Sequence, residues 1–69
     1  MTRLTLTVNG DPRVIEGPAT LADLLRQLEL DARMVVVELN REIVRRPRLA
    51  ETEVQNGDSV ELVHFVGGV

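Results

Sequence analysis

The central part of the chain carries one leucine stripe, and this stripe constrains the fold more than any other feature. Four leucines recur at the helical spacing i, i+3, i+4, i+7: Leu21, Leu24, Leu25 and Leu28. Thr20 is a candidate N-cap, and Asp23 stands three residues later, where an acid suits the positive end of a helix dipole. We expect a helix of about three turns over residues 21–30. Such a stripe can bind a partner, but a short sheet with one apolar face needs one helix of this kind as its cover.

The small size of the chain limits how the fold can be stabilised. It has 69 residues and no cysteine. A core of this size rarely contributes more than ~3–5 kcal/mol, and neither a disulfide nor a thiolate metal site can add to it. The sequence therefore predicts one compact domain with a well-patterned core.

Strand patterns lie on both sides of the helix. Residues 2–8 alternate between apolar and polar side chains, and the Asn9-Gly10 pair that follows is a strong hairpin signal. A second turn signal lies at residues 55–58. The expected strands are residues 2–8, 13–16, 34–39 (a central strand), 43–44 (a minor strand) and 60–66. The expected core is Leu4, Leu6, Val8, Leu21, Leu24, Leu25, Leu28, Val37, Val60 and Leu62, with Leu49 and Val54 as isolated anchors.

This order of elements describes an α+β fold. A hairpin, a crossing helix and a late strand are typical of the β-grasp, in which a mixed sheet of four to five strands wraps around one helix. The first and last strands would pair in the middle of the sheet, and a right-handed crossover is compatible with that pairing. We expect a β-grasp domain over residues 1–66 and a flexible Gly-Gly tail over residues 67–69.

Composition argues against several classes of function. The net charge is −3 and Phe65 is the only aromatic residue, so the basic stripe and stacking aromatics of a nucleic-acid protein are missing. No apolar stretch approaches the ~20 residues that cross a bilayer, and the polar start is no signal peptide. We therefore expect a cytoplasmic protein. The sequence shows no metal-ligand spacing, no phosphate-binding loop and no nucleophile with a base, so we expect neither an enzyme nor a bound cofactor or metal.

Two groups of polar residues leave alternatives open. His64 is the only histidine, and it is either a surface residue at a strand end or a contact with a partner protein. Four arginines form a basic cluster in an acidic protein: Arg41, Arg45, Arg46 and Arg48. The cluster is either a solvated loop or a surface that docks on an acidic partner.

The end of the chain is the remaining candidate for chemistry. The last strand runs into Gly67-Gly68, and Val69 follows. Terminal residues often fray, but glycine has no Cβ, so such a tail can enter a narrow crevice. A terminal carboxylate is ionised at neutral pH and must be activated, typically as a mixed anhydride with AMP, before acyl transfer. The alternation of the strand places Val63 and Phe65 on the face away from the helix, and with Val66 they form an expected docking patch for a partner, rimmed by some of the arginines.

Four stretches of the chain resemble the ThiS family, the small ubiquitin-like sulfur carriers of thiamin biosynthesis. They are Val8-Asn9-Gly10, the leucine helix at 21–28, VVVELNREIV at 35–44 and, most specifically, GDSVELVHFVGG at 57–68. The resemblance implies that an E1-like enzyme adenylates the terminal glycine with ATP. The acyl group then becomes a thiocarboxylate that gives its sulfur to thiazole synthase.

By position, Gly68 would carry the acyl group and Gly67 would be the second glycine of the tail. The resemblance also implies a sulfur donor such as a cysteine desulfurase. Because the family reacts through a carboxyl-terminal glycine, Val69 would first have to be removed. Two other functions remain open: a carrier for molybdopterin or tRNA thiolation, and a β-grasp binding module whose tail is inert.

Overall fold

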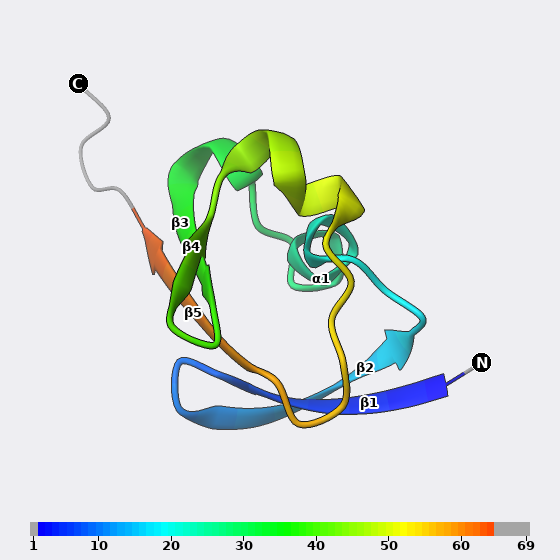
Figure 1. The fold of residues 1–69 in the computed structure, drawn as a ribbon. Coiled ribbons are helices and arrows are strands. Elements are labelled where there is room, and N and C mark those ends of the chain that lie inside the picture. Colours follow the sequence, from blue (N-terminus) through cyan, green and yellow to red (C-terminus); the bar gives the residue numbers. More distant parts are fainter. Residues whose placement is uncertain (1, 65–69) are drawn as a thin grey trace.

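Within residues 2–64, five strands form one mixed sheet that curls around one α-helix (Figure 1). The computed structural model describes residues 2–64. Its strands are β1 (Thr2–Val8), β2 (Asp11–Gly17), β3 (Val35–Leu39), β4 (Glu42–Val44) and β5 (Ser59–His64), and its helix is α1 (Leu21–Gln27). Two 3-10 helices complete the fold, η1 (Ala32–Met34) and η2 (Arg46–Glu51). The expected α+β β-grasp, with one helix held by a mixed sheet, is confirmed.

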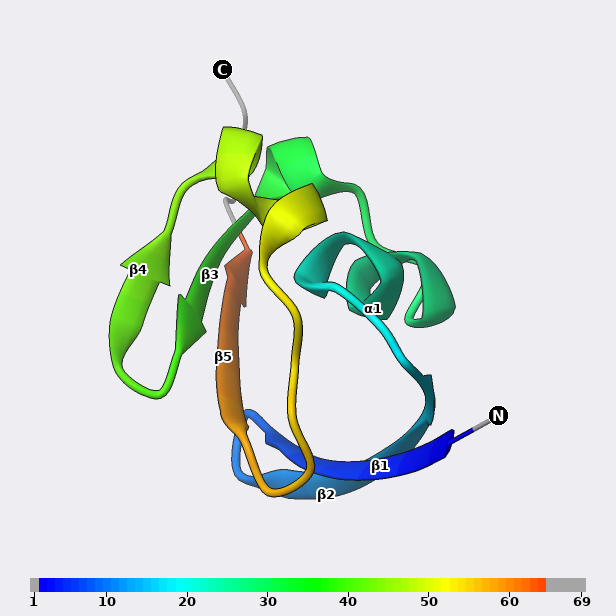
Figure 2. The ribbon, with the colours of Figure 1, turned by 45° about the vertical axis from the view of Figure 1, so that its right-hand side comes forward.

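The first and last strands pair in the middle of the sheet, as expected. The strand order is β2-β1-β5-β3-β4, and β1 runs parallel to β5 with Thr7 opposite Ser59 and Val8 opposite Val60. Each of these two strands has an antiparallel neighbour on its other side, β2 beside β1 and β3 beside β5. Figure 2 shows β5 between the two hairpins. The central position expected for residues 34–39 therefore belongs to β5, and β3 lies second from the edge.

The second strand is longer than residues 13–16. The two-residue turn at Asn9-Gly10 has positive φ angles of 51° and 85°, so pairing resumes at once with Val8 opposite Asp11. Pro12 lies inside the strand although proline cannot donate to a ladder. It is tolerated because β2 is an edge strand with one side facing solvent.

The helix begins where expected and ends earlier. The Thr20 side chain accepts a hydrogen bond from Asp23 N–H, and the Asp23 carboxylate accepts one from Thr20 N–H, which completes a capping box. α1 ends at Gln27 rather than at residue 30 because Glu29 adopts a left-handed φ of 59°. Leu30 N–H then donates to the Leu25 carbonyl and Glu29 N–H to the Arg26 carbonyl, the pattern of a Schellman motif.

Two short helices were not predicted. Met34 belongs to η1 rather than to the strand, because Asp31 caps a 3-10 turn just before β3. The polar connection around Pro47 contains η2, in which proline occupies the first turn and its fixed φ suits a helix start. η2 brings Leu49 into the core, so the role of Leu49 as an anchor is confirmed.

The core lies between the sheet and α1. All the residues expected there are buried except Leu28, which is half-buried and packs against the rim of the core. The expected anchor Val54 is buried as well. Further buried side chains are Ile15, Ala19 and Val35. No helix within residues 2–64 has the length and apolar character that a membrane crossing requires.

Candidate functional site

The structure describes the base of the predicted tail and not the tail itself. β5 ends at His64, and the predicted site residues Phe65, Val66, Gly67 and Gly68 lie outside the described residues, as does Val69. The acyl-carrying role of Gly68 and the domain boundary after residue 66 therefore stay predictions. What the structure places is the strand that leads to the glycines, at the centre of the sheet.

Asn9 holds the end of this strand. Where β1 ends, Asn9 N–H donates to the Val60 carbonyl at 2.9 Å. The Asn9 side chain then continues the ladder: its Oδ1 accepts from Leu62 N–H at 2.7 Å, and its Nδ2 donates to the Leu62 carbonyl at 3.1 Å. The Asn9 side chain thus makes with the Leu62 backbone the two hydrogen bonds that a neighbouring strand would otherwise make.

Asn40 supports the same strand from the other hairpin. It occupies a turn position with a φ of 50°, and its N–H donates to the Ser59 carbonyl at 2.7 Å. Its Oδ1 accepts from Ser59 N–H at 2.9 Å. In the sequence, the Asn9-Gly10 pair and the segment Asn40-Arg41-Glu42 between two predicted strands indicate these asparagines only as turn residues. Their second function was missed because it joins residues that are 53 and 19 positions apart.

Substitution of Asn9 should loosen the end of β5. We expect Asn9→Gly to cost about 1–3 kcal/mol, because two part-buried hydrogen bonds are lost while glycine still accepts the left-handed turn. Hydrogen exchange of the Leu62 amide should rise more than that of Leu6 in β1. Asn9→Ala should cost more than Asn9→Gly because it adds the strain of a positive φ. Unchanged exchange at Leu62 in Asn9→Gly would show that the side chain does not hold the strand.

The outer face of the sheet carries apolar side chains next to this strand end. Val63 lies on that face as predicted, 53% exposed, and stands opposite Val36 on β3. Ile43 on β4 is 64% exposed. Val63 is the one residue of the expected docking patch that lies among the described residues, and it is exposed on the predicted face; the docking role itself stays a prediction.

Two glutamates share the outer face of β3 and β5. Glu38 and Glu61 stand directly opposite each other in the antiparallel register, and like charges in this position are destabilising. Within residues 2–64 neither forms an ion pair. The charges beside Val63 on these two strands are therefore negative. The four arginines of the basic cluster lie in the β3–β4 turn and around the start of η2, and their role as a rim of the docking patch stays a prediction.

The other candidate residues are exposed. His64 stands opposite Val35 at the end of β5, and its side chain is exposed, so both alternatives for it, a surface residue at a strand end and a contact with a partner, stay open. All four arginines of the basic cluster are exposed too, and Arg48 lies 3.6 Å from Glu51. Exposure is compatible with a solvated loop and with docking, so both readings of the cluster stay open.

The described part of the chain offers surfaces rather than a reaction centre. Among residues 2–64 no polar or charged side chain is buried, and no three histidine or acidic side chains lie close enough together to hold a metal ion. The pKa of Asp31 is lowered to about 2, chiefly by the side-chain hydrogen bonds that Arg33 donates, with further contributions from the Arg33 backbone and from Arg46. Asp31 lies on the surface, where this shift reflects an exposed ion pair.

A β-grasp body whose central last strand leads into two glycines defines a ubiquitin-like protein. A family model described as "ThiS family" matches residues 6–68. The chain belongs to the ThiS family.

The relatives agree with this assignment. The chain is 41% identical over 64 residues to "Sulfur carrier protein ThiS" of Bacillus subtilis, covering 91% of this chain and 97% of that one. It is similar to the crystal structure of the thiamine biosynthesis protein ThiS of Geobacter metallireducens, with a TM-score of 0.81 and 39% identity over 96% of this chain and all of that one. It is also 40% identical over 65 residues to "Thiazole synthase" of Paramagnetospirillum magneticum. That match covers 94% of this chain but only 20%, about a fifth, of the length of the thiazole synthase.

Proposed function

We propose that this protein is the sulfur carrier of thiazole formation in thiamin biosynthesis and acts as a co-substrate rather than as an enzyme. The observation that carries the proposal is the extent of the family match, which ends on Gly68 and so includes both glycines. The relatives named sulfur carrier and thiazole synthase support the same pathway, because a chain like this one forms part of the latter protein.

The chemistry takes place on the carboxyl group of Gly68 in a chain that ends there. The carboxylate attacks the α-phosphate of ATP, pyrophosphate leaves, and an acyl adenylate forms. A sulfur nucleophile then attacks the acyl carbon and AMP leaves, so that a thiocarboxylate remains. ATP is bound by the E1-like partner. The unbranched α-carbon of glycine leaves the carbonyl open to this attack.

The folded body positions the tail in its partners. The centre of a sheet is a rigid base, and Asn9 and Asn40 hold β5 against its neighbours. We assign the outer face, with Val63, Glu38 and Glu61, to the activating enzyme. The two glutamates on this face would fit a cationic surface of the activating enzyme beside its site. Phe65 and Val66 would extend the same contact toward the glycines.

Activation in vitro tests the proposal. A chain ending at Gly68 is incubated with the host's E1-like enzyme of the thiamin pathway, ATP, Mg²⁺ and sulfide, and its intact mass is measured. We expect a gain of about 16 Da, from sulfur replacing one oxygen of the carboxyl group. The product should support thiazole formation by thiazole synthase. A cysteine desulfurase with cysteine and a thiol reductant can replace sulfide, because its persulfide forms an acyl disulfide with the activated carboxyl group and the thiol then reduces this to the thiocarboxylate.

Controls separate this function from the alternatives. A chain ending at Val66 keeps the body and lacks the glycines, and it should gain no mass. Activation only by the enzymes of molybdopterin or tRNA thiolation would identify a carrier of another pathway. If no E1-like enzyme of the host activates the Gly68-ended chain while partners still bind its sheet, the protein is a binding module with an inert tail.

A further inference from the structure

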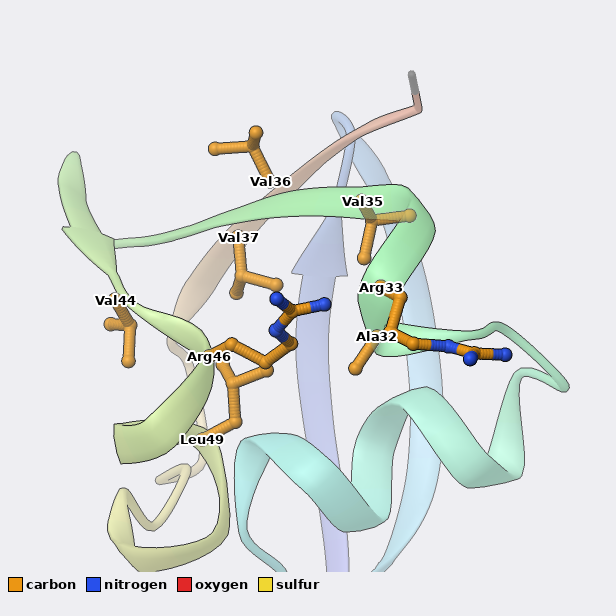
Figure 3. A pocket seen from close by; sticks show the side chains of 8 residues that line it. All are labelled: Ala32, Arg33, Val35, Val36, Val37, Val44, Arg46 and Leu49. Atoms are coloured by element: carbon orange, nitrogen blue, oxygen red, sulfur yellow. The ribbon is translucent and has the colours of Figure 1, made fainter. Parts of the chain in front are cut away.

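A hollow of about 210 Å³ opens on the helix side of the sheet, between η1, β3 and η2 (Figure 3). Its walls are apolar: Ala32, Val35, Val37, Val44 and Leu49. In Figure 3 the side chains of Val35 and Val37 point into the hollow, whereas Val36 points to the other side of the strand. β3 therefore contributes alternate residues to two separate surfaces, the outer face and this hollow.

A guanidinium group lies over the apolar walls. Arg46 begins η2, and in Figure 3 its side chain extends toward β3 and over the hollow. Within residues 2–64 Arg46 forms no ion pair. Guanidinium is weakly hydrated and binds carboxylates in a bidentate fashion. An arginine over apolar walls is therefore suited to an anion that is attached to an apolar group.

The second arginine at the hollow already has a partner. Arg33 Nη2 lies 2.8 Å from Asp31 Oδ2, and Arg33 N–H donates to Asp31 Oδ1 at 2.9 Å. These contacts hold the pKa of Asp31 at about 2, so Asp31 is ionised at neutral pH and balances the charge of Arg33. Arg46 is near enough to contribute to the lowered pKa of Asp31, but within residues 2–64 it forms no ion pair, so its guanidinium is the one at the hollow that can pair with a carboxylate.

We propose that this hollow binds a segment of the sulfur-accepting enzyme in which an Asp or Glu stands beside an aliphatic or aromatic side chain. The volume of about 210 Å³ suits one side chain, whereas pockets for drug-sized ligands measure ~300–1,000 Å³. The proposal rests on the proposed carrier function and names the surface that meets the second partner of the carrier.

Position and charge favour the sulfur-accepting enzyme over the activating enzyme. Val35, in the wall of the hollow, stands opposite His64 at the end of β5, so the hollow lies beside the strand that leads to the glycines. The outer face, assigned to the activating enzyme, carries Glu38 and Glu61, which would repel an acidic segment. The hollow, with Arg46, is the side of β3 that attracts such a segment and is left for the enzyme that takes the sulfur. The two sides of β3 thus select partners of opposite charge.

Binding to both enzymes tests the hollow. The dissociation constants of the chain ending at Gly68 for the host's thiazole synthase and for its E1-like enzyme are measured by calorimetry, for this parent and for four variants of it. Arg46→Glu should raise the Kd for thiazole synthase by at least about tenfold and change the Kd for the E1-like enzyme by less than about twofold. Arg46→Gln should show a smaller loss in the same direction. Ala32→Leu, which fills the hollow without changing charge, should also weaken thiazole synthase binding.

Arg45→Glu is the matched control. It makes the same change of charge one residue away, and Arg45 does not line the hollow, so the Kd for thiazole synthase should stay within about threefold of the parent. Equal losses for Arg45→Glu and Arg46→Glu, parent-like binding by Ala32→Leu, or a loss confined to the E1-like enzyme would each overturn the proposal. If the parent binds both enzymes and Arg46→Glu binds as the parent does, the hollow is rejected and the carrier function stands. If the parent binds neither enzyme, the carrier function fails and the hollow with it.

Discussion

Replacing Leu25 with alanine is expected to lower the free energy of unfolding by ~2–5 kcal/mol. The Leu25 side chain is 2% exposed and lies in the core between α1 and the sheet. A single core of this size contributes only ~3–5 kcal/mol, so the variant should be largely unfolded at moderate temperature. Thermal and urea denaturation followed by circular dichroism measure the loss.

Neighbouring positions on the same helix provide the controls. Leu28 is only half-buried, so Leu28→Ala should cost less than Leu25→Ala. The Arg26 side chain is 71% exposed, and Arg26→Ala should change the denaturation midpoint far less than either leucine variant. An unchanged midpoint for Leu25→Ala, or equal losses at Leu25 and Arg26, would show that the leucine stripe is not the part of α1 that holds the fold together.

The parts of the fold that follow from local periodicity could be predicted from the sequence. Alternation in residues 2–8, the Asn-Gly turn and the capping box at Thr20 each act within a few residues, and each is present in the structure. The end of the helix could not be predicted in the same way. Glycine usually marks a left-handed residue after a helix, but here Glu29 takes that conformation.

The surroundings of the site depend on contacts between distant residues. That Glu38 stands opposite Glu61 follows only from the register of β3 against β5, which no local pattern determines. The bonds from Asn9 to Leu62 likewise need the parallel pairing of β1 with β5. The hollow at Arg46 requires η2, a helix that the proline-containing connection did not reveal. The sequence therefore predicted which strand leads to the tail, and the structure added what surrounds its base.

Removal of Val69 is expected to turn a poor substrate of the activating enzyme into a good one. A β-branched side chain on the terminal residue crowds the carboxyl carbon and stiffens χ1 at the position that an enzyme must thread into a narrow site. The family match ends at Gly68 and leaves Val69 outside. We expect ATP–pyrophosphate exchange with the Gly68-ended chain to exceed that with the Val69-ended chain by more than about a hundredfold, since a site built for glycine excludes a larger side chain.

Three further chains make the comparison specific. A chain ending at Gly67 shortens the tail without adding a side chain and tests whether reach alone limits activation. The variant Gly68→Ala of the Gly68-ended chain carries one methyl group at the reacting position. Its rate of ATP–pyrophosphate exchange should fall between the rates of the Gly68-ended and Val69-ended chains. If crowding is the cause, the variant Val69→Gly should show faster ATP–pyrophosphate exchange than the Val69-ended chain, although both have the same length.

In the host, a peptidase would have to expose Gly68, and chain ends are preferred sites of such cleavage. Intact mass spectrometry of the protein isolated from its own cells should then show a species lighter by one valine residue, and a fraction of it heavier by about 16 Da as the thiocarboxylate. Because activation requires a free carboxyl group on Gly68, the thiocarboxylate should be absent from every species that retains Val69. A thiocarboxylate on Val69 itself, or a Gly68-ended chain that the E1-like enzyme never adenylates, would contradict it directly.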